Sequence, residues 1–180
     1  MEFETLETER LLLKKLTPEL FKALFESCSE EEISRLLGLA SREEFLKEKE
    51  KSDGGYKTYD RTIAAFVLVL KETGETVGRG GFHNWYQAHR RAEIGYVLNK
   101  DEHKRKGYMS EAVGAMLYYG FNSMGLNRVE AFIGPGNAAS LGVVRKYGFT
   151  QEGHLKQHFV VNGEAQDSLV FSLLKEAYKG

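Results

Sequence analysis

The stretch Glu93-Ile94-Gly95-Tyr96-Val97-Leu98, followed five residues later by Lys104-Arg105-Lys106-Gly107-Tyr108-Met109-Ser110-Glu111, decides the fold. The first segment predicts a strand that ends near Leu98, and the second predicts a basic, glycine-containing loop that enters a helix near Tyr108. The first amides of a helix are unpaired and carry the positive end of its dipole, so they attract anions. Three consecutive cations strengthen that attraction. The segment therefore predicts a phosphate or pyrophosphate site, and the alternative is a solvated basic turn before an amphipathic helix.

Two phosphate-binding motifs are absent from the sequence, which limits the kinds of phosphate ligand that the loop can be expected to bind. The chain has no pair of glycines five residues apart followed by Lys-Ser or Lys-Thr, which a P-loop requires. The stretch Gly78-Arg79-Gly80-Gly81 is not a dinucleotide fingerprint, and it falls within an expected strand. Those glycines instead predict a bulge or a close approach of two backbones.

Outward from this stretch, the two halves of the chain have different patterns. The N-terminal half predicts an antiparallel meander after two or three short helices. The C-terminal half alternates helices and strands, with an Asn162-Gly163 turn near its end. The expected strands are Thr8–Leu16, Thr62–Leu70, Thr76–Asn84, Arg91–Leu98, Arg128–Ile133, Phe149–Leu155, Gln157–Val161 and Glu164–Leu173. The pattern predicts a mixed α/β sheet covered by helices.

Composition limits the class of protein. The length of 180 residues suits one domain, residues 1–180, and the net charge of -1 disfavours a nucleic-acid partner. No apolar run approaches the roughly 20 residues that span a bilayer. The single cysteine, Cys28, excludes an intrachain disulfide, and the acidic N-terminus is unlike a signal peptide. We expect a cytoplasmic protein without a membrane partner.

Several short stretches, in order and spanning nearly the whole chain, resemble the GNAT superfamily of N-acetyltransferases, specifically its RimJ/RimL-like branch. They are Glu7–Leu13, His89–Tyr96, Lys106–Ala112, Gly125–Ala131, Asn137–Ser140 and Lys146–Phe149. The resemblance implies a mixed, mostly antiparallel sheet of about seven strands with about four helices. Two adjacent parallel strands are expected to splay apart for CoA. It also implies acetyl-CoA as cosubstrate and no metal.

The resemblance assigns the cofactor-binding residues. The family's pyrophosphate loop places Lys104 first, Gly107 at the central glycine and Met109 last. Lys104 and Met109 both depart from the family pattern, and the Met109 side chain is expected to point away from the ligand. Tyr96, Val97 and Leu98 would meet the pantetheine arm. Asn137 would also reach it, although an asparagine here equally predicts a helix N-cap.

Amine acylation needs a neutral amine and a proton for the departing thiolate, so a base and an acid are expected. Glu93 lies 14 residues before Gly107, the spacing of the general-base glutamate in related enzymes. Its alternative role is an ion pair with Arg90 or Arg91. Ser140 matches the serine proposed as the acid in RimL-like members, and its alternative is an exposed first-turn serine.

Five further positions are considered for the site. The family resemblance aligns Val144 with a tyrosine that acts as the general acid in many members. It aligns Phe159 with a glutamate that RimL-like members carry. His83 and Trp85, in the strand before that of Glu93, are expected to line the acceptor pocket. His103 is expected to be exposed, and no residue group has convincing metal-ligand spacing.

The expected activity is direct transfer of acetyl from acetyl-CoA to an amine, without an acyl-enzyme. The resemblance favours a protein N-terminal α-amine, such as that of a ribosomal protein. A small amine, a polyamine or an antibiotic remains open as the acceptor. A non-catalytic acyl-CoA-binding module is the alternative of another class. Homodimers are common in this branch, so a homodimer is expected by analogy.

Overall fold

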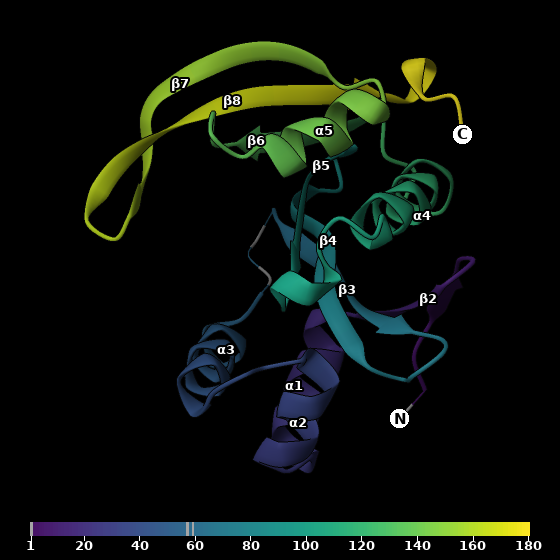
Figure 1. Ribbon diagram of the computed structural model, residues 1–180, viewed down its shortest axis with the longest axis vertical. Helices are drawn as coiled ribbons and strands as arrows, with labels where there is room; N and C mark the ends of the chain where they lie inside the picture. Colours follow the sequence, from purple (N-terminus) through teal and green to yellow (C-terminus); the bar gives the residue numbers. More distant parts are fainter. Residues whose placement is uncertain (1, 57, 59) are drawn as a thin grey trace.

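The computed structural model of the protein describes residues 2–56, 58 and 60–180. Within this part the chain forms eight strands, five α-helices and two short 3-10 helices (Figure 1). The strands are β1 (Thr5–Glu7), β2 (Leu11–Leu16), β3 (Thr62–Leu70), β4 (Thr76–Tyr86), β5 (Arg91–Leu98), β6 (Arg128–Ile133), β7 (Thr150–Val161) and β8 (Glu164–Leu174). The helices are α1 (Pro18–Ser27), α2 (Glu30–Leu37), α3 (Arg42–Gly54), α4 (Tyr108–Asn122) and α5 (Ala138–Lys146), with the 3-10 helices η1 (Asp101–His103) and η2 (Lys175–Ala177).

All eight strands form one sheet in the order β1-β2-β3-β4-β5-β6-β8-β7. Neighbours are antiparallel except β5 and β6, which are parallel. The predicted mixed, mostly antiparallel sheet is therefore confirmed. The strand expected over residues 8–16 begins only at Leu11, because residues 8–10 form the turn between β1 and β2. In this turn the Thr8 amide donates to the Leu11 carbonyl and the Thr8 hydroxyl accepts from the Leu11 amide. The two strands expected over residues 149–161 are one long strand with irregular register.

Local signals account for the helix ends. Thr17 caps α1 by accepting a hydrogen bond from the Leu20 amide, and Pro18 fills the first helical position. Ser41 caps α3 by accepting from the Glu44 amide, but the Glu44 carboxylate accepts from Ala40 rather than from Ser41. Only half of a capping box is therefore present at α3.

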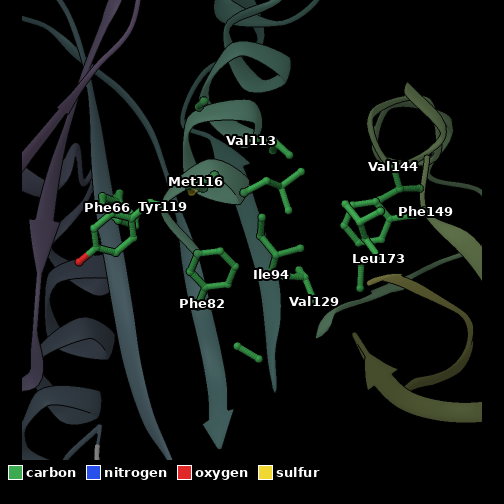
Figure 2. Close-up of a cluster of buried hydrophobic side chains, with 14 of the residues drawn as sticks. Phe66, Phe82, Ile94, Val113, Met116, Tyr119, Val129, Val144, Phe149 and Leu173 are labelled. Atoms are coloured by element: carbon green, nitrogen blue, oxygen red, sulfur yellow. The ribbon is translucent and has the colours of Figure 1, made fainter. Parts of the chain in front are cut away.

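Helices cover both faces of the sheet. The alternating residues of β3 separate the two sides, since Phe66 and Leu68 belong to one buried cluster and Val67 and Val69 to the other. The first cluster packs under α4 and α5, where Met116 and Phe82 lie among the buried side chains (Figure 2). The second packs under α1, α2 and α3. Each fully buried large apolar side chain contributes roughly 1.5–3 kcal/mol.

Glycines let α4 and β3 approach β4 closely. A Cβ on Gly80 would lie 2.9 Å from the Met116 Cε atom of α4. Gly81 has φ +148°, and a Cβ there would lie 2.3 Å from the Ala64 carbonyl oxygen. The prediction that these glycines mark a close backbone approach is confirmed.

The β7–β8 hairpin extends from the far edge of the sheet as a long, curved ribbon (Figure 1). Only the Leu169–Leu174 part of β8 also pairs with β6. Residues 164–168 pair with β7 alone, so the distal hairpin has two strands and little cover.

The parallel pair β5–β6 opens part-way along its length. Three register pairs join the strands, namely Arg91 with Arg128, Ala92 with Val129 and Glu93 with Glu130. Beyond Glu93, β5 stays paired with β4 as far as Leu98, but β6 no longer pairs with it. The predicted splay is therefore present, and it begins at Ile94.

Candidate active site

Glu93 lies at the last β5–β6 pair, where the splay begins. Its Oε1 atom is 3.0 Å from Nε2 of His83, and its Oε2 atom accepts a hydrogen bond of 3.0 Å from the Asn84 side-chain amide. The side chain is 19% exposed. The carboxylate is thus oriented on one side by an imidazole and on the other by an amide.

The charge state of Glu93 follows from this environment. Burial raises the pKa of Glu93, but the hydrogen bond and charge of His83, the Asn84 amide and the charge of His158 more than offset it. The net pKa lies below its ordinary 4.5. Glu93 is therefore a carboxylate at neutral pH and can accept a proton, either directly or through His83.

A bulge in β4 lets two consecutive residues reach the same carboxylate. Side chains alternate along a regular strand, so His83 and Asn84 would normally point to opposite faces. The β4–β5 register shifts after His83, and Asn84 adopts the left-handed region with φ +46°. Arg61 donates to the Asn84 Oδ1 atom at 3.3 Å, which leaves its amide directed at Glu93. Sequence reasoning missed this role of Asn84, because the bulge depends on pairing with β5.

The ion pairs considered for Glu93 with Arg90 or Arg91 are not those of the structure. Arg91 binds Glu130 at 2.9 Å, and Arg90 donates to the Gly125 carbonyl at 2.9 Å. Both arginines therefore serve the closed part of the β5–β6 pair, and Glu93 is left for His83.

Gly95 makes room for the His83 ring. A Cβ on Gly95 would lie 2.9 Å from the His83 Cε1 atom. The imidazole therefore lies over the bare backbone of β5, next to the opened stretch of that strand.

His83 borders a cavity of about 360 Å³ on the face of the sheet that carries α1 and α3. Its lining is mostly apolar and includes Phe21, Tyr56, Ile63, Ala65, Phe82 and Val97. The cavity also reaches Gly95 and Tyr96 on β5. An apolar hollow beside a proton acceptor is the arrangement expected of a substrate pocket.

A buried carboxylate, Glu48, lies in the wall of this cavity. It accepts hydrogen bonds from Tyr56 at 3.0 Å, Arg79 at 3.2 Å and Lys51 at 3.3 Å. Burial raises the pKa of Glu48, but the two cations and the phenol lower it by more than burial raises it. The net pKa of Glu48 is therefore below its usual value. Glu48 is charged and fully engaged, and it ties α3 to β4.

Trp85, predicted beside His83, lies elsewhere. It lines a separate cavity of about 300 Å³ with Arg61 and His89, and it packs partly against the main core. The structure therefore does not bring Trp85 and His83 to one pocket.

The loop before α4 has the geometry of an anion site. Gly107 is the N-cap of α4 in the left-handed conformation, with φ +82°, and no side chain caps the helix. The amides of the first turn, including those of Tyr108 and Met109, are thus not used by a capping side chain. Arg105 and Lys106 are exposed, and Lys104 is paired with Asp101 at 2.5 Å.

A long-range clamp holds this loop. Arg10 donates to the Lys106 carbonyl at 2.9 Å and binds Glu111 through Nε at 2.7 Å. The Arg10 amide and the Thr8 hydroxyl also donate to Glu111, at 2.7 Å and 2.6 Å. The turn between β1 and β2 therefore fixes the start of α4. The Thr8 and Arg10 positions belong to a stretch of family resemblance, but their contact with Glu111 is not visible in the sequence.

Ser110 is held by α5. Its hydroxyl accepts from the Lys146 ammonium at 2.7 Å, and its carbonyl accepts from the Tyr147 hydroxyl at 2.6 Å. The Met109 side chain packs against the main core, as predicted for a side chain directed away from the loop. Lys146 thus adds a cation near the loop.

The opened part of β5 presents unusual side chains. Val97 is 53% exposed although it lies within a strand. The Tyr96 hydroxyl has no accessible surface and no hydrogen-bond partner among the described residues. Leu98 is partly buried and ends the strand. An uncapped helix start, a strand segment that β6 leaves unpaired and an orphaned hydroxyl fit a ligand with a pyrophosphate and a long arm that contains amide groups, such as acetyl-CoA.

Across the splay, Asn137 caps α5 by accepting from the Ser140 amide at 3.1 Å through Oδ1. The cap alternative is therefore present, and it uses only the oxygen of the Asn137 side chain. Ser140 lies in the first turn and is partly exposed. Val144, one turn further on, is buried beside Phe149 and Leu173 (Figure 2). Val144 is therefore a core residue.

One histidine, His103, differs from expectation, and a second, His158, lies near Glu93. His103 was expected to be exposed but is 4% exposed, because η1 folds back against Glu75 at the end of the β3–β4 turn. His103, Glu75 and Glu102 form a group with metal-ligand spacing, but Lys100 already binds Glu75 at 2.7 Å. His158 stacks near Phe132 and contacts Ser168, close enough for its charge to act on Glu93.

A splayed parallel strand pair, an uncapped basic helix start and a carboxylate paired with a histidine that lines an apolar cavity together define a CoA-dependent acyltransferase. The chain belongs to the GNAT acetyltransferase family, since residues 10–150 match the acetyltransferase (GNAT) domain. It is thus a GNAT-type N-acetyltransferase, from a family that uses acetyl-CoA. Among the described residues, no helix has the length and apolar character needed to cross a membrane.

Relatives and a solved structure agree with this assignment. The uncharacterized N-acetyltransferase YoaA of Bacillus subtilis is 35% identical over 96% of this chain and 98% of its own. A GNAT-family acetyltransferase structure from Bacillus anthracis has a TM-score of 0.68 and 28% identity, covering 96% of this chain and 99% of that one.

Two relatives have names that state an acceptor. Bacillus subtilis YdaF, whose name proposes a ribosomal N-acetyltransferase, is 36% identical over 59% of this chain and 58% of its own. The spermidine N(1)-acetyltransferase of Escherichia coli K12 is 26% identical over 67% of this chain and 63% of its own.

Proposed function

We propose that the protein transfers acetyl from acetyl-CoA to the N-terminal α-amine of a protein. The observation that carries this proposal is the charge balance of the cavity beside His83. Its described lining residues include the cations Lys51 and Arg79 and a single carboxylate, Glu48, which is already bound to both.

That balance disfavours a polyamine. Spermidine brings further ammonium groups besides the one acetylated, and each needs a carboxylate or a cluster of carbonyls once it leaves water. Glu48 is already bound to two cations, Lys51 and Arg79, so its negative charge is offset before any further ammonium group arrives. A peptide N-terminus instead brings one amine followed by carbonyl groups. Arg79 is 31% exposed and has guanidinium donors beyond the one that binds Glu48, so it suits such carbonyls.

The similarity to YdaF supports the same acceptor, whereas the similarity to the spermidine enzyme supports the alternative. The identity to YdaF is higher, but the matched part of the chain is smaller. The cavity charges, rather than the names, are therefore the main support for a peptide N-terminus as the acceptor.

The residues divide the reaction between them. Acetyl-CoA supplies the activated acyl group. The α4 amides, Arg105 and Lys106 would hold its pyrophosphate, and Tyr96–Leu98 and Asn137 would border its pantetheine arm. Glu93 and His83 take the proton from the incoming amine, and Asn84 and Gly95 keep that pair in position. Ser140, at the start of α5, lies across the splay from β5 on the side where the thiol leaves.

The test is an acceptor panel assayed by thiol release from acetyl-CoA. It contains short peptides with free N-termini, the same peptides with blocked N-termini, spermidine and lysine. We expect turnover only with free peptide N-termini, and an increase in peptide KM of about tenfold in Arg79→Gln with little change in kcat.

Faster turnover of spermidine than of every peptide would overturn the acceptor assignment. Tight acetyl-CoA binding without turnover of any amine would indicate the non-catalytic acyl-CoA-binding module instead.

A further inference from the structure

The Tyr96 side chain occupies the opened part of β5 on the face opposite Glu93. It lies three residues beyond the last β5–β6 pair, and its register partner on β4 is Gly80. A Cβ on Gly80 would lie 3.2 Å from the Tyr96 Cβ atom, so the glycine leaves space for the base of this side chain. Tyr96 also packs against the main core cluster under α4 and α5.

The hydroxyl of Tyr96 is buried without a well-formed hydrogen bond among the described residues. Such an orphan is costly, because the group has left water and gained no partner. The Ser140 side chain lies beside it, close enough to influence its pKa. Tyr96 and Ser140 thus approach each other from the two sides of the splay.

No other described phenol near this place is available. The hydroxyl of Tyr147, the tyrosine next to the C-terminal end of α5, is engaged with the Ser110 carbonyl at 2.6 Å. Val144, which takes the position of the tyrosine that serves as the general acid in many family members, is buried in the core. Tyr96 is therefore the described phenol beside the splay whose hydroxyl is buried without a well-formed hydrogen bond.

We propose that Tyr96 is the proton donor to the departing sulfur, with Ser140 orienting its hydroxyl. The inference rests on the proposed acetyl transfer, but not on the choice of acceptor. The amine nitrogen forms a bond to the acyl carbon while the carbon–sulfur bond breaks. The sulfur takes the Tyr96 proton, and the proton lost by the amine goes to Glu93 through His83. Solvent then takes the proton from Glu93 and returns one to Tyr96, so the enzyme is regenerated and free thiol and amide are the only products.

The electrostatics of Tyr96 agree with a donor role. Burial raises the pKa of Tyr96, and the neighbouring Ser140 side chain opposes this only in part. The phenol therefore keeps its proton at neutral pH until a strong base appears beside it, which a thiolate expelled into an apolar gap would be.

The first test measures binding without turnover. Wild type and Tyr96→Phe are titrated with CoA and with desulfo-CoA, which lacks the sulfur, in a calorimeter. We expect wild type to bind CoA several-fold more tightly than desulfo-CoA, and Tyr96→Phe to bind both alike. Tyr147→Phe is the matched control, because losing the Ser110 contact weakens both ligands equally. An unchanged CoA preference in Tyr96→Phe would overturn the proposal.

The second test varies the leaving group. Tyr96→Phe is expected to lower kcat about a hundredfold with acetyl-CoA. The loss should shrink with the selenoester analogue, because a selenolate leaves without protonation. Equal losses with both esters would assign Tyr96 a packing role and overturn the proposal. Because the titration needs no acceptor, a wrong acceptor assignment leaves it intact and the two failures can be told apart.

Discussion

The two halves of β5 differ in how many neighbouring strands pair with their backbone. From Arg91 to Glu93 the strand is paired on both sides, and from Ile94 to Leu98 it is paired only with β4. The paired half is also stabilised by ion pairs, since Glu130 of β6 binds both Arg91 and Arg128. The opened half has an exposed valine and an orphaned phenol. One strand therefore serves as scaffold up to Glu93 and as a ligand site beyond it.

The two glutamates at the boundary sharpen this comparison. Glu93 and Glu130 are register partners on adjacent strands, so two like charges face each other. Glu130 is neutralised by two arginines, which are always charged. Glu93 is instead held by an imidazole, whose ring nitrogens can both donate and accept a hydrogen bond, and by an amide. The same residue type is thus structural on β6 and suited to proton transfer on β5.

Replacing Glu93 with Gln should have the largest effect. The change keeps the shape and the Asn84 contact but removes the proton acceptor, so we expect kcat to fall about 10²–10⁴-fold. The dissociation constant for acetyl-CoA should stay nearly unchanged, because Glu93 does not touch the loop before α4. Steady-state kinetics and calorimetric titration check the two halves of this prediction. Unchanged turnover would remove Glu93 from the chemistry.

The same replacement on the other strand should separate the two roles. Glu130→Gln leaves Arg91 and Arg128 without their shared carboxylate, so we expect the free energy of unfolding to fall by about 1–3 kcal/mol. Turnover of the folded protein should fall far less than in Glu93→Gln. Urea unfolding and kinetics on the same preparation measure both. A Glu130→Gln protein as stable as wild type would show that the ion network is not what closes the strands.

The sequence predicts those features of β5 and its site that depend on neighbouring residues, and it does not predict those that depend on distant strands. The strand Arg91–Leu98 and the helix start at Tyr108 follow from alternation and helical spacing, and both match the structure. Glu93 is predicted because its position 14 residues before Gly107 matches the general-base glutamate of the family that the sequence resembles. Its partners are not predicted, because Asn84 reaches it only through a bulge that forms against β5.

Contacts between distant segments account for the remaining differences. The clamp of Arg10 on Glu111 joins residues 101 positions apart, and nothing local to either residue indicates it. His103 follows charged neighbours, which favours exposure, yet it is buried where η1 meets Glu75. The Tyr96 hydroxyl is orphaned only because two strands separate. Each case depends on tertiary placement rather than on pattern.

Adding one methyl group to the opened half should weaken the site without closing it. Gly95→Ala would place a Cβ 2.9 Å from His83 Cε1 and push the imidazole away from Glu93. We expect kcat to fall about tenfold, since a displaced catalytic group loses its alignment. Gly142→Ala in α5 is the control, because its new Cβ meets nothing within 4 Å. The control should keep its kcat. Equal losses in both variants would contradict the claim that Gly95→Ala acts by displacing the His83 imidazole.

The smallest effect is a pH dependence of stability that belongs to Glu93 alone. Its pKa in the folded protein is lowered below the ordinary 4.5, chiefly because His83 and Asn84 outweigh burial. A lowered folded pKa contributes stability that is present above the unfolded value and is lost as pH falls through the folded one. The free energy of unfolding of wild type minus that of Glu93→Gln should therefore stay level from about pH 7 to pH 5 and decline below the unfolded value. Urea unfolding of both proteins across this range cancels the other carboxylates. A difference that stays level down to pH 3 would mean that His83 and Asn84 do not stabilise the charged form of Glu93, and the contrast with Glu130 would then rest on geometry alone.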